Sequence, residues 1–460
     1  MMNILRMRAT IAIPFILILS FPLLSLMLNA SAVTAPSVYS GYTGVDPKPI
    51  PPPPALGPAN SIVTDPTFGS RILRVTDAYT AGGMSLIPGD AGFFRTWNAD
   101  STALKLMSAN GKSWWVTFDP VNFKVGGGSS QPSLHPLNIN HFWEWSAVDP
   151  HVLYFLNGTQ LGKYNISTDT TINLGGSPTN DPVTYHVAVV GRDNWACSVA
   201  GAGTQDTYTK LFCIDPGNPT QNKFIDIVKR TINGIAQTDP NWPTAASGQT
   251  IGIHSIAGSA GGSWLAVSFL RQSWGKGIAV LNLTTNTWSL AKGTWAGHIS
   301  LGDGKLVNGS GSTNGRDSRG AMIRDPNNMT DVTKYVYLMQ PPGTVGWFDA
   351  EHSSWFNAST NPNAPILFSR YNITSPPAPV PWYGEIIMAA GDGSNTVWRF
   401  AHNHNGGGGY FGEAFAQISN DGRWALFSSY WDGTLGPSKG DFGIGTRIDT
   451  FIVELVKPGG

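Results

Sequence analysis

The residues of this sequence best suited to proton transfer or metal binding are its nine histidines. Neutral imidazole accepts a proton near pH 7 and binds divalent metals, so several imidazoles in one place indicate catalysis or coordination. Six of the nine precede or open the first strand of a repeated unit, which predicts that they meet at one mouth of a central channel. The six are His141, His186, His254, His298, His402 and His404. For each, the alternative is a polar side chain that only satisfies strand ends or holds water.

Two of the six, His402 and His404, are separated by a single residue. In an extended segment this spacing sends both imidazoles to the same side, as shared metal coordination requires. His186 and His254 are chemically suited to removing a proton at neutral pH. His352 is expected in a turn on the opposite face.

Arginine and tryptophan fall in loops predicted for the same face. Arg271 and Trp274 share one loop, Arg316 and Arg319 share another, and Trp431 lies near the end of the chain. Arginine binds carboxylates bidentately and tryptophan stacks on sugar rings. Together with the imidazoles, these residue types predict a pocket for an anionic sugar.

The amino-acid composition restricts which fold classes and which partners are possible. Charged residues make up 13%, with 29 basic and 29 acidic side chains, which excludes nucleic acid as a partner held by bulk charge. The 54 glycines and 33 prolines argue against long helices, and 41% hydrophobic residues argue against disorder. An all-β protein is the natural expectation.

The chain divides into three predicted parts. Residues 1–32 have a positive start, an apolar stretch and small residues at their end, which predicts a signal peptide and a secreted or periplasmic protein. A retained membrane anchor is the alternative. Residues 33–60 are proline-rich and are interpreted as a linker. Residues 61–460 are expected to form one domain.

A recurring unit of three strands runs through residues 61–460, and each copy ends near Asp or Asn. Copies end near positions 119, 165, 215, 282, 349, 400 and 453, which predicts a single β-propeller, with seven blades preferred and eight possible. Residues 70–76 are placed to add an outer strand to the last blade and close the ring. Cys197 and Cys213 fall on neighbouring strands of one blade, around a hairpin centred near Gln205; a disulfide is preferred and free thiols are the alternative.

The segment 418–433 resembles the repeat of Tol-Pal-type propellers and of oligogalacturonate lyases. The lyase resemblance implies a divalent metal, manganese or calcium, held by a Gln-x-x-His-x-His segment and a more N-terminal His. The matching segment here is 399–404, with Arg399 in place of Gln, so the implied ligands are His298, His402 and His404. It also implies β-elimination at a uronic acid, with an arginine thought to remove the proton at C5.

The sequence therefore predicts a monomeric exported propeller that acts on an acidic polysaccharide or oligosaccharide. His254, His186, Arg271, Arg316 and Arg319 are the candidate catalytic residues, and the choice among them stays open. The candidate substrate-binding residues are Trp274, Arg399, Trp431 and His141. A propeller that binds glycans or cell-surface proteins without catalysis is the alternative from another class.

Overall fold

The computed structural model describes residues 33–456 except 129, 140–141, 271–272, 274–276, 292–298, 309–320, 330–332, 334, 340–350, 371–379 and 407–408. Every described strand belongs to one compact unit that begins at Val33. Residues 1–32, the predicted signal peptide, lie outside the described residues. Among the described residues, no helix has the length and apolar character needed to cross a membrane.

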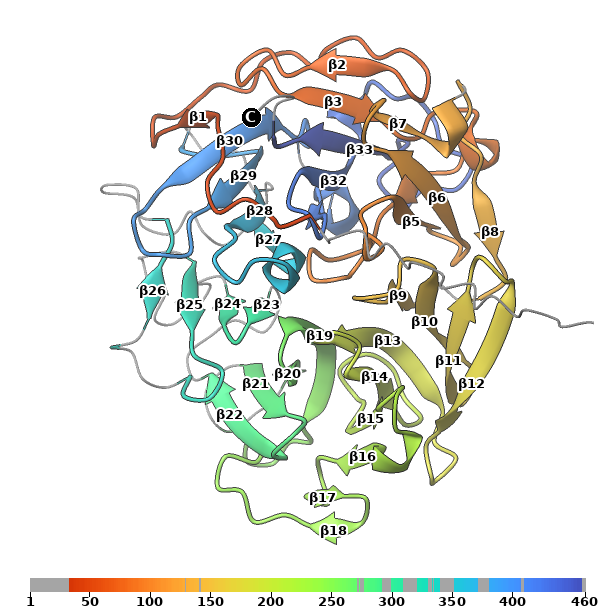
Figure 1. Ribbon diagram of the computed structural model, residues 1–460, viewed down its shortest axis with the longest axis vertical. Helices are drawn as coiled ribbons and strands as arrows, with labels where there is room; N and C mark the ends of the chain where they lie inside the picture. The colour runs from red at the N-terminus through yellow and green to blue at the C-terminus, as the bar shows by residue number, and fades with distance from the viewer. Residues whose placement is uncertain are drawn as a thin grey trace, which may run out of the picture. The chain divides into compact units, whose positions relative to one another are not determined.

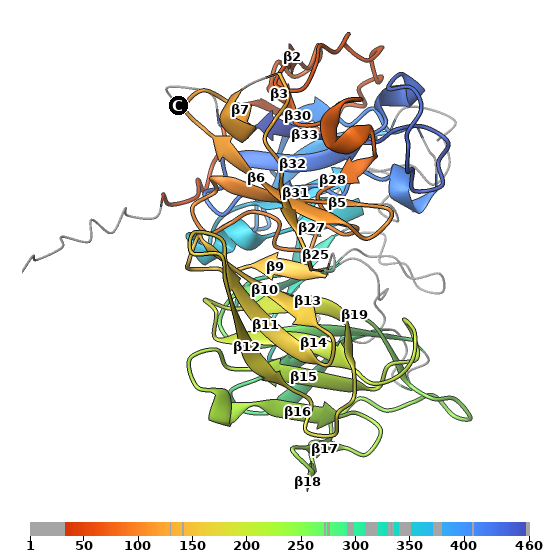
Figure 2. The same ribbon diagram turned by 90° about the vertical axis from the view of Figure 1, so that its right-hand side faces the viewer.

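The first three sheets use strands that follow one another along the chain (Figure 1). One sheet contains β4 (Leu86–Ile87), β5 (Ala103–Ser108), β6 (Ser113–Asp119) and β7 (Lys124–Val125), with β8 (His135–Leu137) also paired to β6. The next contains β9 (Trp143–Trp145), β10 (Val152–Asn157), β11 (Gln160–Asn165) and β12 (Thr170–Gly176). The third contains β13 (Val183–Val190), β14 (Trp195–Ala200), β15 (Lys210–Ile214), β16 (Lys223–Asp226), β17 (Thr231–Ile232) and β18 (Ile235–Ala236), and Figure 2 shows β13 to β16 side by side.

A larger sheet joins two runs of four strands. The first run is β19 (Gly252–Gly261), β20 (Trp264–Leu270), β21 (Gly277–Asn282) and β22 (Thr287–Ala291). The second run is β23 (Ile299–Asp303), β24 (Leu306–Asn308), β25 (Met322–Arg324) and β26 (Val336–Tyr337). Parallel pairing between β19 and β23 connects the two runs.

The last two sheets combine strands from both ends of the domain. One contains β27 (Glu351–Ser354), β28 (Ile366–Arg370), β29 (Glu385–Ala389) and β30 (Val397–His402), with β1 (Tyr42–Thr43) added to β30. The other contains β31 (Gln417–Ile418), β32 (Trp424–Ser429) and β33 (Asp449–Glu454), followed by β3 (Arg71–Arg74) and β2 (Ile62–Thr64). Short 3-10 turns connect strands at η1 (Thr80–Gly82), η2 (Gly126–Gly128), η3 (Pro219–Gln221), η5 (Phe356–Ser359), η6 (Tyr410–Gly412) and η7 (Trp431–Gly433).

The predicted closing strand is confirmed. β3 pairs antiparallel with β33, so residues from the start of the domain complete the sheet formed by its end. Two ion pairs reinforce the junction: Arg71 Nε lies 2.7 Å from Glu454, and Arg74 Nη2 lies 2.5 Å from the buried Asp449. Seven as the number of blades stays a prediction.

The cysteine prediction is also confirmed. Cys197 and Cys213 lie directly opposite each other in the register of β14 and β15, and a disulfide joins them. Both are fully buried, in the cluster that packs β13 to β15 against β19 and β20.

Residues 33–60 differ from the predicted linker because they pack along the domain. β1 pairs with β30, and Tyr39 lies buried against Trp398 and Phe400. A proline-rich extended chain leaves its carbonyl groups free to accept hydrogen bonds. Two indole N–H groups use them: Trp382 donates to Gly44 O at 3.0 Å, and Trp431 donates to Pro54 O at 2.8 Å.

Glycine allows β13 and β19 to lie close together in the middle of Figure 1. A Cβ at Gly258 would meet Val189 O at 2.1 Å, and the Gly191 N–H donates to Ser259 O at 2.8 Å. Because these two strands each carry a candidate histidine, their close approach positions the candidate site.

Candidate functional site

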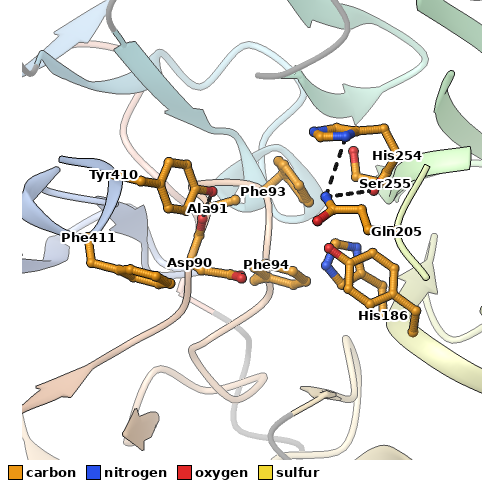
Figure 3. A pocket seen from close by; sticks show the side chains of 11 residues that line it. Asp90, Ala91, Phe93, Phe94, His186, Gln205, His254, Ser255, Tyr410 and Phe411 are labelled. Atoms are coloured by element: carbon orange, nitrogen blue, oxygen red, sulfur yellow. Dashed lines mark hydrogen bonds between the residues drawn. The ribbon is translucent and has the colours of Figure 1, made fainter. Parts of the chain in front are cut away.

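The candidate site is a pocket of about 400 Å³ whose lining residues come from several sheets (Figure 3). The segment between β4 and β5, the first residues of β13 and β19, the β14–β15 loop and η6 all contribute to it. The polar lining residues are Asp90, His186, Gln205, His254 and Ser255, and the aromatic ones are Phe93, Phe94, Tyr185, Tyr410 and Phe411. Such a mixture suits a ring-shaped ligand that carries hydroxyl groups.

His186 and His254 both lie at irregularities in their strands. In β13 the register with β14 shifts between Tyr185 and Val187, which leaves His186 as the extra residue with a φ of 52°. In β19 the register with β20 shifts between Ile253 and Ser255, which leaves His254 as the extra residue. A bulge re-aims the side chain of the extra residue, and such bulges are common beside active sites. The two bulges direct both imidazoles into one pocket.

His254 is oriented by the β14–β15 loop of the preceding sheet. Its Nδ1 lies 2.7 Å from a carboxylate oxygen of Asp206, and Gln205 Nε2 donates to His254 O at 3.2 Å. The carboxylate fixes the tautomer with the proton on Nδ1, so Nε2 is left to accept a proton. The His254 side chain is 34% exposed, so a ligand in the pocket has access to it.

Backbone contacts hold this loop against β19. The Asp206 N–H donates to Ile253 O at 3.0 Å, and the Ile253 N–H donates to Tyr208 O at 2.7 Å. A Cβ at Gly252 would meet Asp206 O at 1.8 Å, so the contact requires glycine at that position. Main-chain contacts between the β14–β15 loop and β19 therefore position the Asp206 carboxylate.

His186 has a different environment, because aromatic rings surround it. It stacks on Tyr185 at 3.9 Å between ring centroids and meets Phe94 edge-to-face at 4.9 Å. Only 3% of the residue is exposed. These contacts fit a residue that shapes the pocket wall better than one that exchanges protons with a ligand.

Asp90 and Tyr410 lie on the side of the pocket opposite His254 (Figure 3). The Tyr410 hydroxyl donates a hydrogen bond to the carbonyl oxygen of Asp90 and so ties η6 to the segment after β4. Burial raises the pKa of the Asp90 carboxyl above its usual range, and the positive charge of Lys105 only partly offsets this effect.

Lys105 and Glu144 are both buried, and their opposite charges attract each other. Lys105 Nζ lies 5.5 Å from the centroid of Phe94 and donates to Trp143 O at 2.8 Å. Burial lowers the pKa of Lys105 and raises the pKa of Glu144, while the attraction between their charges opposes both shifts. Glu144 also accepts hydrogen bonds from the backbone N–H groups of Arg95 and Val189. This network fixes the strands behind the pocket.

His352 lies beside the pocket wall, which corrects the expectation that it occupies a turn on the opposite face. It is the second residue of β27, and its Nε2 lies 2.6 Å from Glu413. Its ring is 6.4 Å from Tyr410 and 4.7 Å from Phe415. Burial lowers the pKa of His352 to about 3 and raises the pKa of Glu413 to about 8, so both groups are neutral near pH 7.

The structure places His402 and His404 next to each other, with ring centroids 6.2 Å apart, but among the packed residues of the domain. His402 stacks on Phe68 and lies 3.4 Å from Asp65, and His404 lies 3.2 Å from Asp432. His402 is the last residue of β30. The strands β27 to β30 are ordered in this sheet as they are in the chain, so β28 and β29 lie between β27, on one side of the sheet, and β30. Across the described residues, no three His, Cys, Asp or Glu side chains gather as a metal site would require.

Two predicted substrate-binding residues are also part of the packing. Arg399 forms a buried bidentate ion pair with Glu385, at 2.7 and 2.5 Å, and is 1% exposed. Trp431 stacks on Phe451 at 4.6 Å. Neither is among the described residues that line the pocket. The remaining predicted residues, His141, Arg271, Trp274, His298, Arg316 and Arg319, lie outside the described residues.

Sequence reasoning missed Asp90, Gln205, Asp206 and Tyr410 as members of the site. A signal was present for two of them, because the hairpin centred near Gln205 belongs to the blade just before His254. Loops between the second and third strands share a face with the starts of inner strands, so this loop can reach His254. No periodic signal marks Asp90 or Tyr410, which lie in irregular segments.

No family model matches the chain, and no curated protein matches it in sequence. Solved structures do match. A structure of oligogalacturonate lyase in complex with manganese aligns with a TM-score of 0.56 and 12% identity, over 88% of this chain and 98% of that one. Oligogalacturonate lyase from Vibrio parahaemolyticus aligns with a TM-score of 0.55 and 9% identity, over the same shares.

The domain is a β-propeller. Likeness at such low identity shows the fold, so the predicted all-β propeller and its structural resemblance to oligogalacturonate lyases are confirmed. What the propeller does must be argued from its own pocket.

Proposed function

We propose that this propeller is a lyase-type enzyme that cleaves a uronic acid-containing polysaccharide by β-elimination. The observation that carries the proposal is the pair of bulged strands that direct His186 and His254 into one aromatic-lined pocket, with His254 oriented by Asp206. The structural likeness to oligogalacturonate lyases supports the same class of substrate. The proposal includes export of a monomeric chain, with acidic polysaccharide or oligosaccharide as its partner.

In the proposed reaction, His254 is the general base. Its Nε2 takes the proton from C5 of the uronate, and Asp206 stabilises the imidazolium that forms. The electron pair of the C5–H bond becomes the C4–C5 double bond, and the bond from C4 to the glycosidic oxygen breaks. Phe93 and Phe94 provide apolar faces on which a sugar ring can stack.

The C5 proton becomes acidic only if the adjacent carboxylate is neutralised. In the described part of the pocket lining, neither arginine nor lysine is present. Arg271, Arg316 and Arg319 are the residues proposed for this role.

A divalent metal at His298, His402 and His404 is the other route to neutralisation that the lyase likeness suggests. The described residues supply two of these imidazoles and no complete group of three ligands. Those two also pack against Phe68 and Trp431 and are absent from the described lining of the pocket. The described residues therefore do not fit such an ion, and the elimination above is derived without it.

One observation favours a second candidate, a propeller that binds glycans without cleaving them. Five of the described lining residues are aromatic, whereas none of the described lining residues is an arginine or a lysine that could bind an anionic sugar. Stacking on neutral sugars needs only the aromatic rings.

A substrate survey separates the two candidates. The purified chain is incubated with pectic, algal and glucuronic acid-containing polysaccharides, and ultraviolet absorbance follows the unsaturated product. We expect a rise with at least one of them, lost in His254→Gln and retained in His151→Gln, which changes an exposed histidine. Binding without any rise in absorbance would contradict the lyase proposal and support the binding module.

A further inference from the structure

We propose that Asp90 is the general acid that delivers a proton to the leaving oxygen in the same pocket. This assignment rests on the proposed function, because it concerns the group that leaves C4 during the elimination. An alkoxide leaves poorly, so protonation of the glycosidic oxygen as the bond breaks accelerates the step.

The pocket has the arrangement that this role requires. His254 and Gln205 lie at one end, and Asp90, Tyr410 and Phe411 lie at the other, with Phe93 and Phe94 between them (Figure 3). A sugar ring over the two phenylalanines would present its C5 hydrogen toward His254 and its C4 oxygen toward Asp90. Base and acid then act on opposite sides of the C4–C5 bond, the base at the C5 hydrogen and the acid at the oxygen on C4.

The surroundings of Asp90 favour the protonated form of its carboxyl group and hold its main chain in place. Burial favours the neutral acid. The Tyr410 hydroxyl holds the Asp90 main chain through its hydrogen bond to the carbonyl oxygen, and burial raises the pKa of that phenol, so it remains a donor at neutral pH. Tyr410 is thus a positioning residue.

The proton and electron balance closes without any further reactant. His254 gains the C5 proton, the C5–H electrons form the C4–C5 double bond, and the C4–O electrons stay on the leaving oxygen. Asp90 gives its proton to that oxygen and becomes a carboxylate. His254 then releases its proton to water, and Asp90 takes up a proton from water, so both groups are ready for the next turnover.

The test compares two substrates of the uronate configuration that the wild-type chain cleaves. One carries a glycosyl group on the C4 oxygen, and the other carries a 4-nitrophenoxy group at C4, which leaves without protonation. Asp90→Asn is expected to lower kcat about 10²–10⁴-fold on the first and less than about tenfold on the second. His254→Gln is expected to lower kcat on both, and Tyr410→Phe is expected to lower kcat about tenfold on the first only.

The controls distinguish failure of the acid assignment from failure of the proposed function. Asp392→Asn changes an exposed aspartate in the turn before β30 and should alter neither rate. Equal losses on both substrates in Asp90→Asn, or no loss on either, would overturn the acid assignment while the lyase function stands. If the wild-type chain yields no unsaturated product from either substrate, the proposed function fails and the role of Asp90 fails with it.

Discussion

Two pairs of histidines in this domain have different environments: one pair lines the pocket, and the other is buried in the packing. His186 and His254 come from neighbouring sheets, are far apart in sequence, and meet at a pocket because each is the extra residue of a bulge. His402 and His404 are separated in sequence by one residue and are buried, and each contacts a carboxylate and an aromatic ring. The closely spaced His402 and His404 are therefore part of the packing of the domain, whereas the widely separated His186 and His254 line the pocket. Close spacing in sequence is not by itself evidence of a site.

The largest effect that tests this comparison is expected in activity. His254→Gln should lower kcat about 10²–10⁴-fold, because the base that accepts the C5 proton is removed, with little change in the free energy of unfolding. His402→Gln should show the reverse, with reduced stability and a nearly unchanged kcat. Denaturant unfolding and the ultraviolet assay on both variants measure this. Equal kcat losses in the two would place His402 in the catalytic machinery.

The next effect concerns the ion pair beside His402. Arg399→Met should lower the free energy of unfolding by about 3–5 kcal/mol, because the buried Glu385 carboxylate loses its partner. The double variant with Glu385→Leu should recover most of this loss, since no buried charge then remains. Guanidinium unfolding gives both values. A loss below about 1 kcal/mol in the single variant would contradict a structural role.

A smaller effect is expected from the residue that orients His254. Asp206→Asn should lower kcat about 10–100-fold, because the amide stabilises the imidazolium less well than a carboxylate does. KM should change little, since Asp206 is not among the described residues that line the pocket. Asp392→Asn is the matched control. A change in KM alone would make Asp206 a binding residue.

The last effect is a pH dependence of stability at the pocket wall. Burial raises the pKa of Glu413 from 4.5 to about 8 in the folded state, so its contribution is complete below pH 4.5 and is lost as pH rises through 8. His352 has the opposite slope: its folded pKa of about 3 lies below the usual 6.5, so stability is lost as pH falls from 6.5 toward 3.

Glu413→Gln removes the first contribution only. Between pH 5 and 8 the wild-type chain should therefore lose stability relative to this variant, and thermal unfolding across that range measures the difference. Parallel curves for the two proteins would show that Glu413 is already ionised in the folded state.

The sequence allowed the repeats, the closing strand and the disulfide to be predicted, because strand periodicity and turn residues carry that information locally. From the sequence we expected six histidines at one mouth, and of these His186 and His254 line the same pocket. The sequence did not reveal the bulges, and a single extra residue changes which face a side chain occupies. Asp90 and Tyr410 lie in irregular loops, whose paths depend on tertiary contacts such as the hydrogen bond between them.

His402 shows why two of the predicted metal ligands lie in the packing of the domain and not at the pocket. His402 and His404 do lie close together, but strand alternation is not the reason, because β30 ends at His402 and His404 has a φ of 51°. Alternation also carries no information on the distance of a strand from the centre of its sheet. Because His402 ends β30, it meets Asp65 and Phe68 from the segment beside β2.

The attachment of β1 to β30 and of β3 to β33 has a consequence for how the chain reaches its native state. The residues synthesised first in this domain pair with strands made more than 350 residues later. Closing loops of that length is entropically unfavourable until most intervening strands are in place. β3 can pair early with the neighbouring β2, but its other edge and β1 gain their partners only when the ribosome has nearly finished the polypeptide, and folding is completed afterwards.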